Sequence, residues 1–192
     1  MKTAFMTVLA ALALCAAGCQ ADKKLSPDFA GISVARPFVS YEAEDAGYKG
    51  TLLEFSAAYH EIQSEASGRR AVKLEAVGDY TSFTLKDTSN AVVLRYCLPD
   101  GEAGGGTSSL LAVYADGEKA GTILLSSKFA WIYNYAGGWP GSNDPAAGPP
   151  CRFFDDARFF FGCGLPEGTR IVFKKEDEDG WCVIDMAEFE LI

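Results

Sequence analysis

The sequence is poor in histidine, since His60 is the one histidine among 192 residues. Zinc sites usually combine Cys and His ligands, and the chain also lacks the C-x-x-C spacing that such sites use. His60 lies in a polar segment with no Ser or Cys nucleophile signature nearby, so we interpret it as a surface residue and not as a catalytic base. A zinc site is therefore poorly supported.

Basic residues are scarce as well. The chain has 17 Lys and Arg against 26 Asp and Glu, which gives a formal net charge of −9 at pH 7. Nucleic-acid binding needs a basic face that neutralises phosphates, and electrostatic adhesion to anionic lipid has the same requirement. We therefore expect no nucleic-acid partner, and membrane contact only through a lipid anchor.

Helical periodicity is missing after the N-terminal segment. Short apolar or alternating runs are instead separated by Gly, Asp, Asn and Pro, which is typical of an all-β domain. Asp116-Gly117 predicts a tight hairpin, because both positions favour positive φ. No repeat or linker divides the chain, so we expect one domain over residues 37–192. The expected strands are 38–43, 51–55, 71–76, 80–85, 91–98, 109–114, 121–125, 131–133, 158–161, 169–174 and 181–192.

The N-terminus indicates export. Lys2 precedes an apolar run over residues 4–17 that is too short to span a membrane and ends in small residues. The segment before Cys19 resembles a bacterial lipoprotein signal, in which this cysteine becomes the lipidated first residue. We therefore expect a signal peptide over 1–18, a lipidated tether over 19–36, and a protein anchored to the bacterial membrane at the cell surface. Simple secretion, with Cys19 removed, is the alternative.

An even number of cysteines in an exported chain suggests disulfide bonds. Four follow the anchor. Cys151 and Cys163 bracket one aromatic segment and are the preferred pair, which leaves Cys97 with Cys182. Buried free thiols are the alternative for the second pair.

Paired carboxylates suggest a metal site. Glu42 and Glu44 are two residues apart, so on a β-strand both side chains project from one face, and no Lys or Arg stands next to them. If the first and last strands lie side by side, Asp185 adds a third carboxylate, and an oxygen-only set suits Ca²⁺. The alternative is an ordinary polar strand face.

Nine sequence blocks, taken in order, carry a family resemblance. They are YEAED (41–45), ASGRRAVKL (66–74), GDYTSFT (78–84), NAVVLRYCLPD (90–100), LAVYADG (111–117), LLSSKFAWIY (124–133), RFFDDAR (152–158), LPEGTRI (165–171) and IDMAEFE (184–190). The set resembles the carbohydrate-binding modules of the family 6/35 superfamily. It is most similar to the module at the N-terminus of bacterial mycodextranases and α-1,3-glucanases.

The resemblance implies a jelly-roll β-sandwich of the galactose-binding-like kind, with a structural Ca²⁺ at Glu42, Glu44 and Asp185. Backbone carbonyls complete the coordination in such modules, and Arg69 is the candidate here. The chain departs from its relatives before Asp155, where it has Cys151-Arg-Phe-Phe in place of the His residues that they often carry. The family's substrate preference is therefore not carried over.

The function predicted from these observations is non-catalytic glycan binding by a monomeric surface lipoprotein. The partner would be a polysaccharide or oligosaccharide, with α-glucan as the candidate. Sugars stack on aromatic faces and bond to carboxylates, amides and Arg. The expected ligand residues are Tyr135, Trp139, Asn134, Asn143, Asp144, Arg152 and Asp155, whereas Trp131 and Tyr133 are expected to be core residues at least as readily as ligand contacts.

Two other functions remain open on the sequence. A hydrolase is one alternative, because the related modules accompany glucanases. Asp155 and Asp156 are adjacent, however, and would point to opposite faces of a strand, so they cannot flank one glycosidic bond. We therefore expect no enzyme activity. A structural or protein-binding lipoprotein, or an accessory subunit of a glycoside hydrolase, could use the same sandwich, because fold does not fix function.

Overall fold

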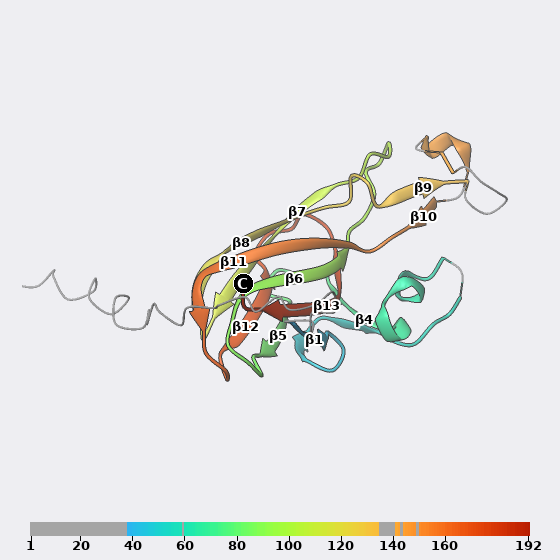
Figure 1. Cartoon of the computed structure of the whole chain (residues 1–192). Coiled ribbons are helices and arrows are strands. Elements are labelled where there is room, and N and C mark those ends of the chain that lie inside the picture. Colours follow the sequence, from blue (N-terminus) through green and yellow to red (C-terminus); the bar gives the residue numbers. More distant parts are fainter. Residues whose placement is uncertain (1–37, 59, 135–140, 143, 149) are drawn as a thin grey trace, which may run out of the picture. The chain divides into compact units, whose positions relative to one another are not determined.

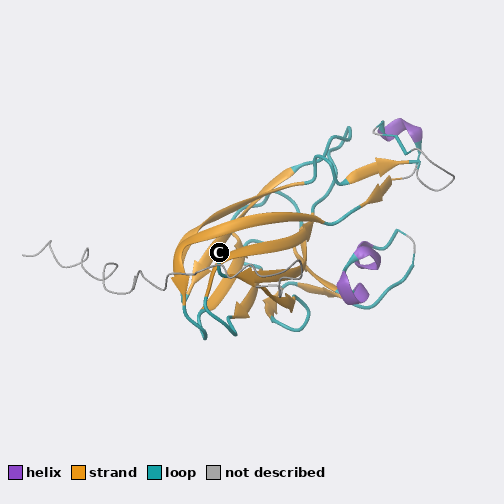
Figure 2. Ribbon diagram, in the orientation of Figure 1, coloured by secondary structure: helices purple, strands orange, loops and turns teal. Residues whose placement is uncertain are grey.

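The computed structural model describes residues 38–58, 60–134, 141, 142, 144–148 and 150–192. Antiparallel strands make up this part of the chain, with three short 3₁₀ helices between them (Figures 1 and 2). None of the helices in these residues is long and apolar enough to cross a membrane. The expectation of an all-β fold is confirmed.

The strands form two main sheets and a small hairpin. The larger sheet (sheet A) has the order β11-β6-β13-β4-β3, and β1 pairs with β13 next to β4. Its strands are β11 (Asp155–Leu165), β6 (Ser89–Cys97), β13 (Cys182–Glu190), β4 (Ala71–Leu74), β3 (Thr51–Leu53) and β1 (Phe38–Glu42).

The second sheet (sheet B) has the order β2-β5-β12-β7-β8. Its strands are β2 (Gly47–Lys49), β5 (Tyr80–Thr84), β12 (Arg170–Lys175), β7 (Ser108–Ala115) and β8 (Glu118–Ser126), and the separate hairpin pairs β9 (Trp131–Tyr133) with β10 (Pro150–Arg152). The 3₁₀ helices are η1 (Ile62–Glu65), η2 (Ser67–Arg69) and η3 (Pro145–Ala147).

One apolar core lies between the two sheets. Alternate residues of each strand point inward, so sheet A contributes Leu94 and Phe189 and sheet B contributes Phe83 and Phe173, all at most 2% exposed. Phe83 meets Phe173 and Phe189 at ring-centroid distances of 6.0 Å. These contacts join β5 and β12 to β13, and the burial of large apolar side chains drives the pairing of the sheets.

Two connections between strands differ in their surroundings. Asp116 and Gly117 join β7 to β8 with φ values of 48° and 88°, which confirms the predicted tight hairpin. Residues 174–180 lead from β12 in sheet B to β13 in sheet A. Lys175 within that link is fully buried, and its Nζ lies 2.5 Å from Asp179 Oδ1. The charged run is therefore partly a buried ion pair and not only a solvated face.

The structure corrects the predicted bond between Cys151 and Cys163. Cys151 is a free thiol in β10, whereas Cys163 lies near the far end of β11. An extended strand rises about 3.3 Å per residue, so β11 carries Cys163 more than roughly 20 Å from its start. A disulfide bond needs Cα atoms within about 7 Å of each other.

The predicted bond between Cys97 and Cys182 is absent as well. Cys97 is paired in register with Val183, so the preceding residue, Cys182, points to the opposite face of sheet A. Cys182 packs into the core between the sheets, and Cys97 packs on the outer side against Ala71 and Val183. Both are buried free thiols, and burial raises the pKa of Cys97 to about 12.

Tyr96 bridges the two sheets through its hydroxyl group. Removing that hydroxyl measures how much this polar contact contributes to the free energy of unfolding. The hydroxyl donates to the Ser126 carbonyl at 2.8 Å and accepts from the Ser126 N–H at 2.9 Å. Tyr96→Phe should therefore lower the free energy of unfolding by about 1–3 kcal/mol in urea denaturation, because two buried backbone groups lose their partner. Tyr80→Phe, at a half-buried ring on sheet B, is the matched control. Equal stability of Tyr96→Phe and wild type would contradict this account.

Candidate functional site

The carboxylates predicted to bind metal lie where the first and last strands meet. β1 pairs with β13, Glu42 opposite Met186, and the Ala43 N–H donates to the Asp185 carbonyl at 2.9 Å. This confirms that the two ends of the domain lie side by side. β1 ends at Glu42, however, so Glu44 belongs to the following turn and not to the same strand face.

A β-bulge directs Asp185 into this cluster. The register of β13 against β6 shifts between Ile184 and Met186, which leaves Asp185 as the extra residue. Ile184 and Ala187 therefore both face the core, and the Asp185 side chain is fully buried. The buried position of this carboxylate follows from the bulge and not from regular strand alternation.

The turn at η2 supplies hydrogen bonds to two of the carboxylates. The Ser67 N–H donates to Asp185 Oδ1 at 2.9 Å, and the Ser67 hydroxyl donates to Glu42 Oε1 at 2.8 Å. Gly68 follows with φ 56°, and a Cβ there would lie 3.4 Å from Glu44 Oε1. Glycine at this position therefore suits both the left-handed backbone and the close approach of Glu44.

Arg95 is the cation of the cluster. Its Nη1 lies 3.2 Å from Asp185 Oδ2, and its Nη2 donates to the Glu65 carbonyl at 3.3 Å. The guanidinium also lies 5.4 Å from the centre of the Phe154 ring. Sequence analysis missed this residue, because its partner stands 90 positions away and only the pairing of β6 with β13 brings the two together.

Burial controls the charge of the cluster. It raises the pKa of Asp185 to about 6, while the Ser67 N–H and Arg95 oppose the rise and Glu42 and Glu44 add to it. Burial also raises the pKa of Glu44, with Glu42 as a further cause. Two buried carboxylate oxygens, Glu42 Oε2 and Glu44 Oε2, have no hydrogen-bond partner, and Asp185 Oδ2 has the ion pair with Arg95 but no hydrogen bond. The cluster thus has more negative charge than Arg95 alone balances.

The side chains do not form a closed metal site as they stand. Within the described ranges, no group of three or more His, Cys, Asp or Glu side chains is arranged to hold a metal ion. Arg69 has φ 59°, and its carbonyl, the expected backbone ligand, accepts a hydrogen bond from the Ser56 N–H at 3.2 Å. A carbonyl oxygen has a second lone pair, so this contact leaves room for a ligand role.

The predicted sugar-binding residues are only partly placed. Tyr135, Trp139 and Asn143 lie outside the described residues. Asn134 is exposed after β9, and Asp144 caps η3 through a bond from the Ala146 N–H to Oδ1 at 2.9 Å.

Arg152 and Asp155 also have local partners. Arg152 donates to the His60 carbonyl and lies 5.8 Å from the Trp131 ring, while Asp155 accepts from the Asp156 N–H at 2.8 Å. His60 itself is exposed, as predicted. The contacts of the described residues join neither Arg152 nor Asp155 to Asn134 or Asp144, and the predicted ligand set stays a prediction.

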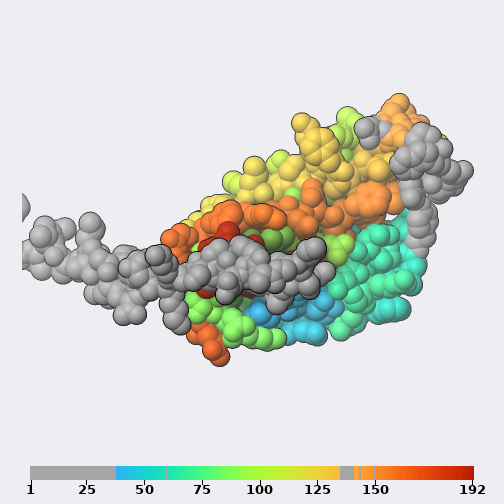
Figure 3. Space-filling view, in the orientation of Figure 1, coloured from blue at the N-terminus to red at the C-terminus, as the bar shows by residue number. Residues whose placement is uncertain are grey.

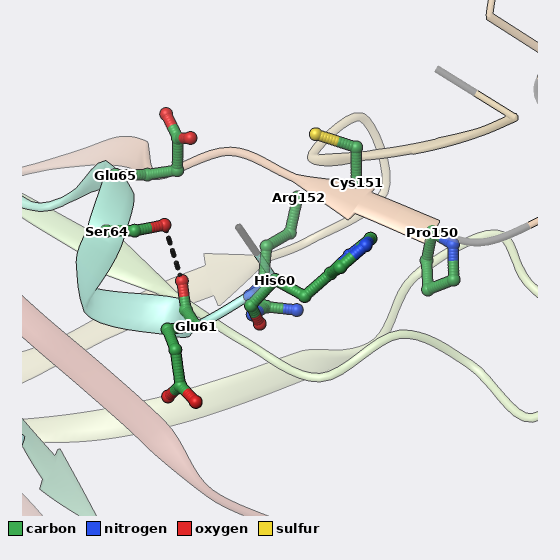
Figure 4. A pocket seen from close by; sticks show the side chains of 7 residues that line it. All are labelled: His60, Glu61, Ser64, Glu65, Pro150, Cys151 and Arg152. Atoms are coloured by element: carbon green, nitrogen blue, oxygen red, sulfur yellow. Dashed lines mark hydrogen bonds between the residues drawn. The ribbon is translucent and has the colours of Figure 1, made fainter. Parts of the chain in front are cut away.

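The hollow beside Arg152 is too small for a sugar. Figure 4 shows it between η1 and β10, with the Arg152 side chain directed toward His60. Its volume of about 10 Å³ holds about one water molecule. Trp131 Nε1 and Arg152 Nε are buried donors without a partner near it. The hollow beside Arg152 therefore suits a bound water molecule better than a sugar ring. The hollow is lined by His60, Glu61, Ser64, Glu65, Pro150, Cys151 and Arg152.

The raised pKa of Asp185 predicts a pH-dependent stability. In a metal-free buffer the unfolded chain loses this proton near the ordinary value of 3.8, but the folded chain keeps it up to about pH 6. The contribution of protonated Asp185 to the free energy of unfolding is therefore fully present below about pH 4. It is lost as the pH rises to about 6, and the free energy of unfolding falls by up to about 3 kcal/mol. Chemical denaturation with a chelator present should show this fall in wild type and not in Asp185→Asn. Parallel pH profiles of the two proteins would contradict the assignment.

Comparison with known proteins identifies the family. The model of the α-1,3-glucanase catalytic domain D1 matches residues 35–192. The catalytic domain of a GH87 α-1,3-glucanase in complex with nigerose is 33% identical, with TM-score 0.72, over 81% of this chain and 28% of that structure. The Agl-KA catalytic domain is 27% identical, with TM-score 0.75, over 82% and 28%.

A third solved structure is similar to this chain to about the same extent. The catalytic unit of the thermostable GH87 α-1,3-glucanase from Streptomyces thermodiastaticus strain HF3-3 is 29% identical, with TM-score 0.68, over 81% of this chain and 26% of that structure. This chain thus spans little more than a quarter of the solved structures that it matches. No curated protein sequence matches it.

These findings correct the predicted function. The prediction of a non-catalytic role is wrong, and so is the expectation of no enzyme, because the matching family and the solved relatives are catalytic domains of α-1,3-glucanases. The similarity to bacterial α-1,3-glucanases is confirmed, whereas membership of the carbohydrate-binding modules of the family 6/35 superfamily is not. The chain belongs to the family of the α-1,3-glucanase catalytic domain D1.

Proposed function

We propose that the chain takes part in the hydrolysis of α-1,3-glucan as the D1 part of a GH87-type catalytic region. The observation that carries this proposal is the match of residues 35–192 to the D1 family. Solved relatives bind nigerose and tetrasaccharides, so the proposed substrate class is the α-1,3-linked glucan chain and its oligosaccharides.

The described carboxylates limit which residues could cleave the bond. Glycoside hydrolysis uses two carboxyl groups separated by about 5–10 Å across the bond. Asp177 and Asp179 share a hydrogen bond that raises the pKa of Asp177, so they are too close to each other to flank a sugar linkage. Asp185 is fully buried in its cluster. The proposal therefore assigns the activity to the D1-containing region and names no cleaving pair within the described residues.

A domain exchange tests the proposal. The D1 part of an active GH87 α-1,3-glucanase is replaced by residues 37–192 of this chain, and reducing sugar released from insoluble α-1,3-glucan is measured. We expect the exchanged enzyme to retain hydrolysis within about tenfold of the parent, since the two D1 parts share about a third of their residues. The controls are the parent and the parent lacking D1. A folded exchanged enzyme no more active than the parent lacking D1 would refute the proposal.

We also propose that Ca²⁺ binds the carboxylate cluster through Glu42, Glu44, Asp185 and the Arg69 carbonyl. The support is the buried carboxylate oxygens without a hydrogen-bond partner, of which Glu42 Oε2 and Glu44 Oε2 also have no ion pair given for them while Asp185 Oδ2 is ion-paired with Arg95, together with an all-oxygen donor set that suits a hard cation. The ion would supply charge neutralisation, which Arg95 now provides for Asp185 alone. Binding would require the side chains to draw closer together.

The calcium proposal predicts a metal-dependent melting temperature. An ion that binds only the folded state stabilises it by about 2.7 kcal/mol at a hundred times its dissociation constant, or roughly 5–10 °C for a domain of this size. Added Ca²⁺ should raise the melting temperature, a chelator should reverse the change, and Glu44→Gln should remove most of the response. Glu61→Gln, at an exposed residue next to η1, is the control. Melting curves that ignore both Ca²⁺ and chelator would exclude the site.

Three finer predictions accompany the proposal: the topology, the lipid anchor and the monomeric state. The connections support jelly-roll topology, because β4, β5, β6 and β7 alternate between the two sheets, as do β11, β12 and β13. Export and lipid attachment at Cys19 stay predictions based on the signal-like segment over 1–18, since residues 1–37 lie outside the described residues. The same holds for the monomeric state.

A further inference from the structure

A groove on the outer face of sheet A lies next to the carboxylate cluster and shares Arg95 with it. It has a volume of about 350 Å³, which lies in the range of small-molecule sites. Three neighbouring strands build it, and in Figure 3 β11 runs along this face as an orange band with parts of β6 (green) and β13 (red) beside it. The lining residues are Val93, Arg95, Phe154, Asp156, Met186 and Glu188.

Strand register explains why these side chains meet. Arg95 of β6 is paired with Asp156 of β11 and with Met186 of β13, so the three form one row across the sheet. Val93, two residues away on β6, is paired with Glu188. Because side chains two residues apart share a face, the two rows lie next to each other on the outer side of the sheet.

The floor and the rim of the groove differ in polarity. Val93, Met186 and the Phe154 ring are apolar, while Asp156 and Glu188 present carboxylates. Such a combination fits a pyranose ring, whose C–H faces pack on apolar surface while its hydroxyl groups donate to carboxylates.

The guanidinium of Arg95 is fixed in the groove before a ligand binds. Its bonds to Asp185 Oδ2 and to the Glu65 carbonyl fix the guanidinium, and the Phe154 ring lies against it. Its side chain is nevertheless 37% exposed. The guanidinium has five N–H donors, so donors beyond these two bonds remain for a ligand. A donor fixed beforehand costs less conformational entropy on binding.

The charge of the groove disfavours an anionic ligand. The positive charge of Arg95 is balanced by Asp185 beneath it, and two acids, the exposed Asp156 and the half-buried Glu188, disfavour an anion. The Ser40 hydroxyl donates to Glu188 Oε1 at 3.3 Å and leaves the second oxygen of that carboxylate for another donor.

We propose that this groove binds a neutral α-1,3-linked gluco-oligosaccharide and so holds a stretch of glucan on D1. The choice of glucose and of the linkage rests on the proposed function, whereas the groove itself rests on its lining. Asp156 and Glu188 accept hydrogen bonds from sugar hydroxyls, Arg95 donates to ring or hydroxyl oxygens, and one sugar face packs on Phe154 and Met186.

Calorimetric titration of the full chain with an α-1,3-linked glucotetraose tests the proposal. Asp156→Ala/Glu188→Ala should lower the affinity at least tenfold, because both acceptors of the rim are lost. Asp87→Ala/Glu118→Ala, which removes the same charges at exposed positions outside the groove, should change the affinity less than twofold. Melting curves of both variants establish that they fold.

The outcomes separate this proposal from the function of the family. No binding by wild type, equal affinity of wild type and the groove variant, or equal losses in both variants would overturn the groove. If the exchanged enzyme fails to hydrolyse glucan but the groove variant loses binding, the groove stands and the hydrolytic role falls. If hydrolysis is retained and the groove variant binds as wild type does, the groove proposal alone is refuted.

Discussion

The middle of β13 depends on one buried carboxylate. Asp185 is fully buried, and an ionised group in that position is costly unless it is paired and hydrogen-bonded. The Ser67 N–H and Arg95 provide those partners, and each comes from a different element: η2 and β6. The β-bulge that inserts Asp185 also resets the alternation of β13, so Ala187 and Phe189 face the core. Core packing and the carboxylate cluster therefore share one backbone irregularity.

Local chemistry made the fold class predictable from the sequence. Asp116-Gly117 needs no distant partner to turn the chain, and alternating runs specify strands wherever they occur. The meeting of Glu42 and Asp185 was anticipated from their types and from the assumption that the first and last strands pair. The bulge, the role of Arg95 and the two rows of the groove were not, because each depends on a register set by residues far apart in the chain. The disulfide prediction failed for a related reason, since proximity in sequence says little once β11 runs extended between Cys151 and Cys163.

The functional error has a different origin. A β-sandwich with a carboxylate cluster that could bind a metal ion is typical of glycan-binding modules. The same architecture occurs inside catalytic regions, so the fold does not distinguish a binding module from part of an enzyme. A carboxylate pair within this chain would be required only if the chain spanned a whole enzyme, whereas it spans about 28% of the GH87 structures that it matches. The failure to find a pair in such a part says nothing about the activity of the whole. Family membership was the stronger observation, because it concerns the order of residues over the whole of 35–192.

Arg95 would link the calcium site and the glucan groove that we propose. On one side its guanidinium neutralises Asp185, and on the other it reaches the floor of the outer groove beside Phe154. A cation bound at the cluster would take over part of that neutralisation and weaken the hold of Asp185 on Arg95. The positive charge available to the groove would then increase, and so would the freedom of the guanidinium. These two effects oppose each other, since charge strengthens hydrogen bonds to sugar oxygens while freedom adds an ordering cost. Calcium and glucan are therefore expected to influence each other through this one side chain, with the sign set by whichever effect is larger.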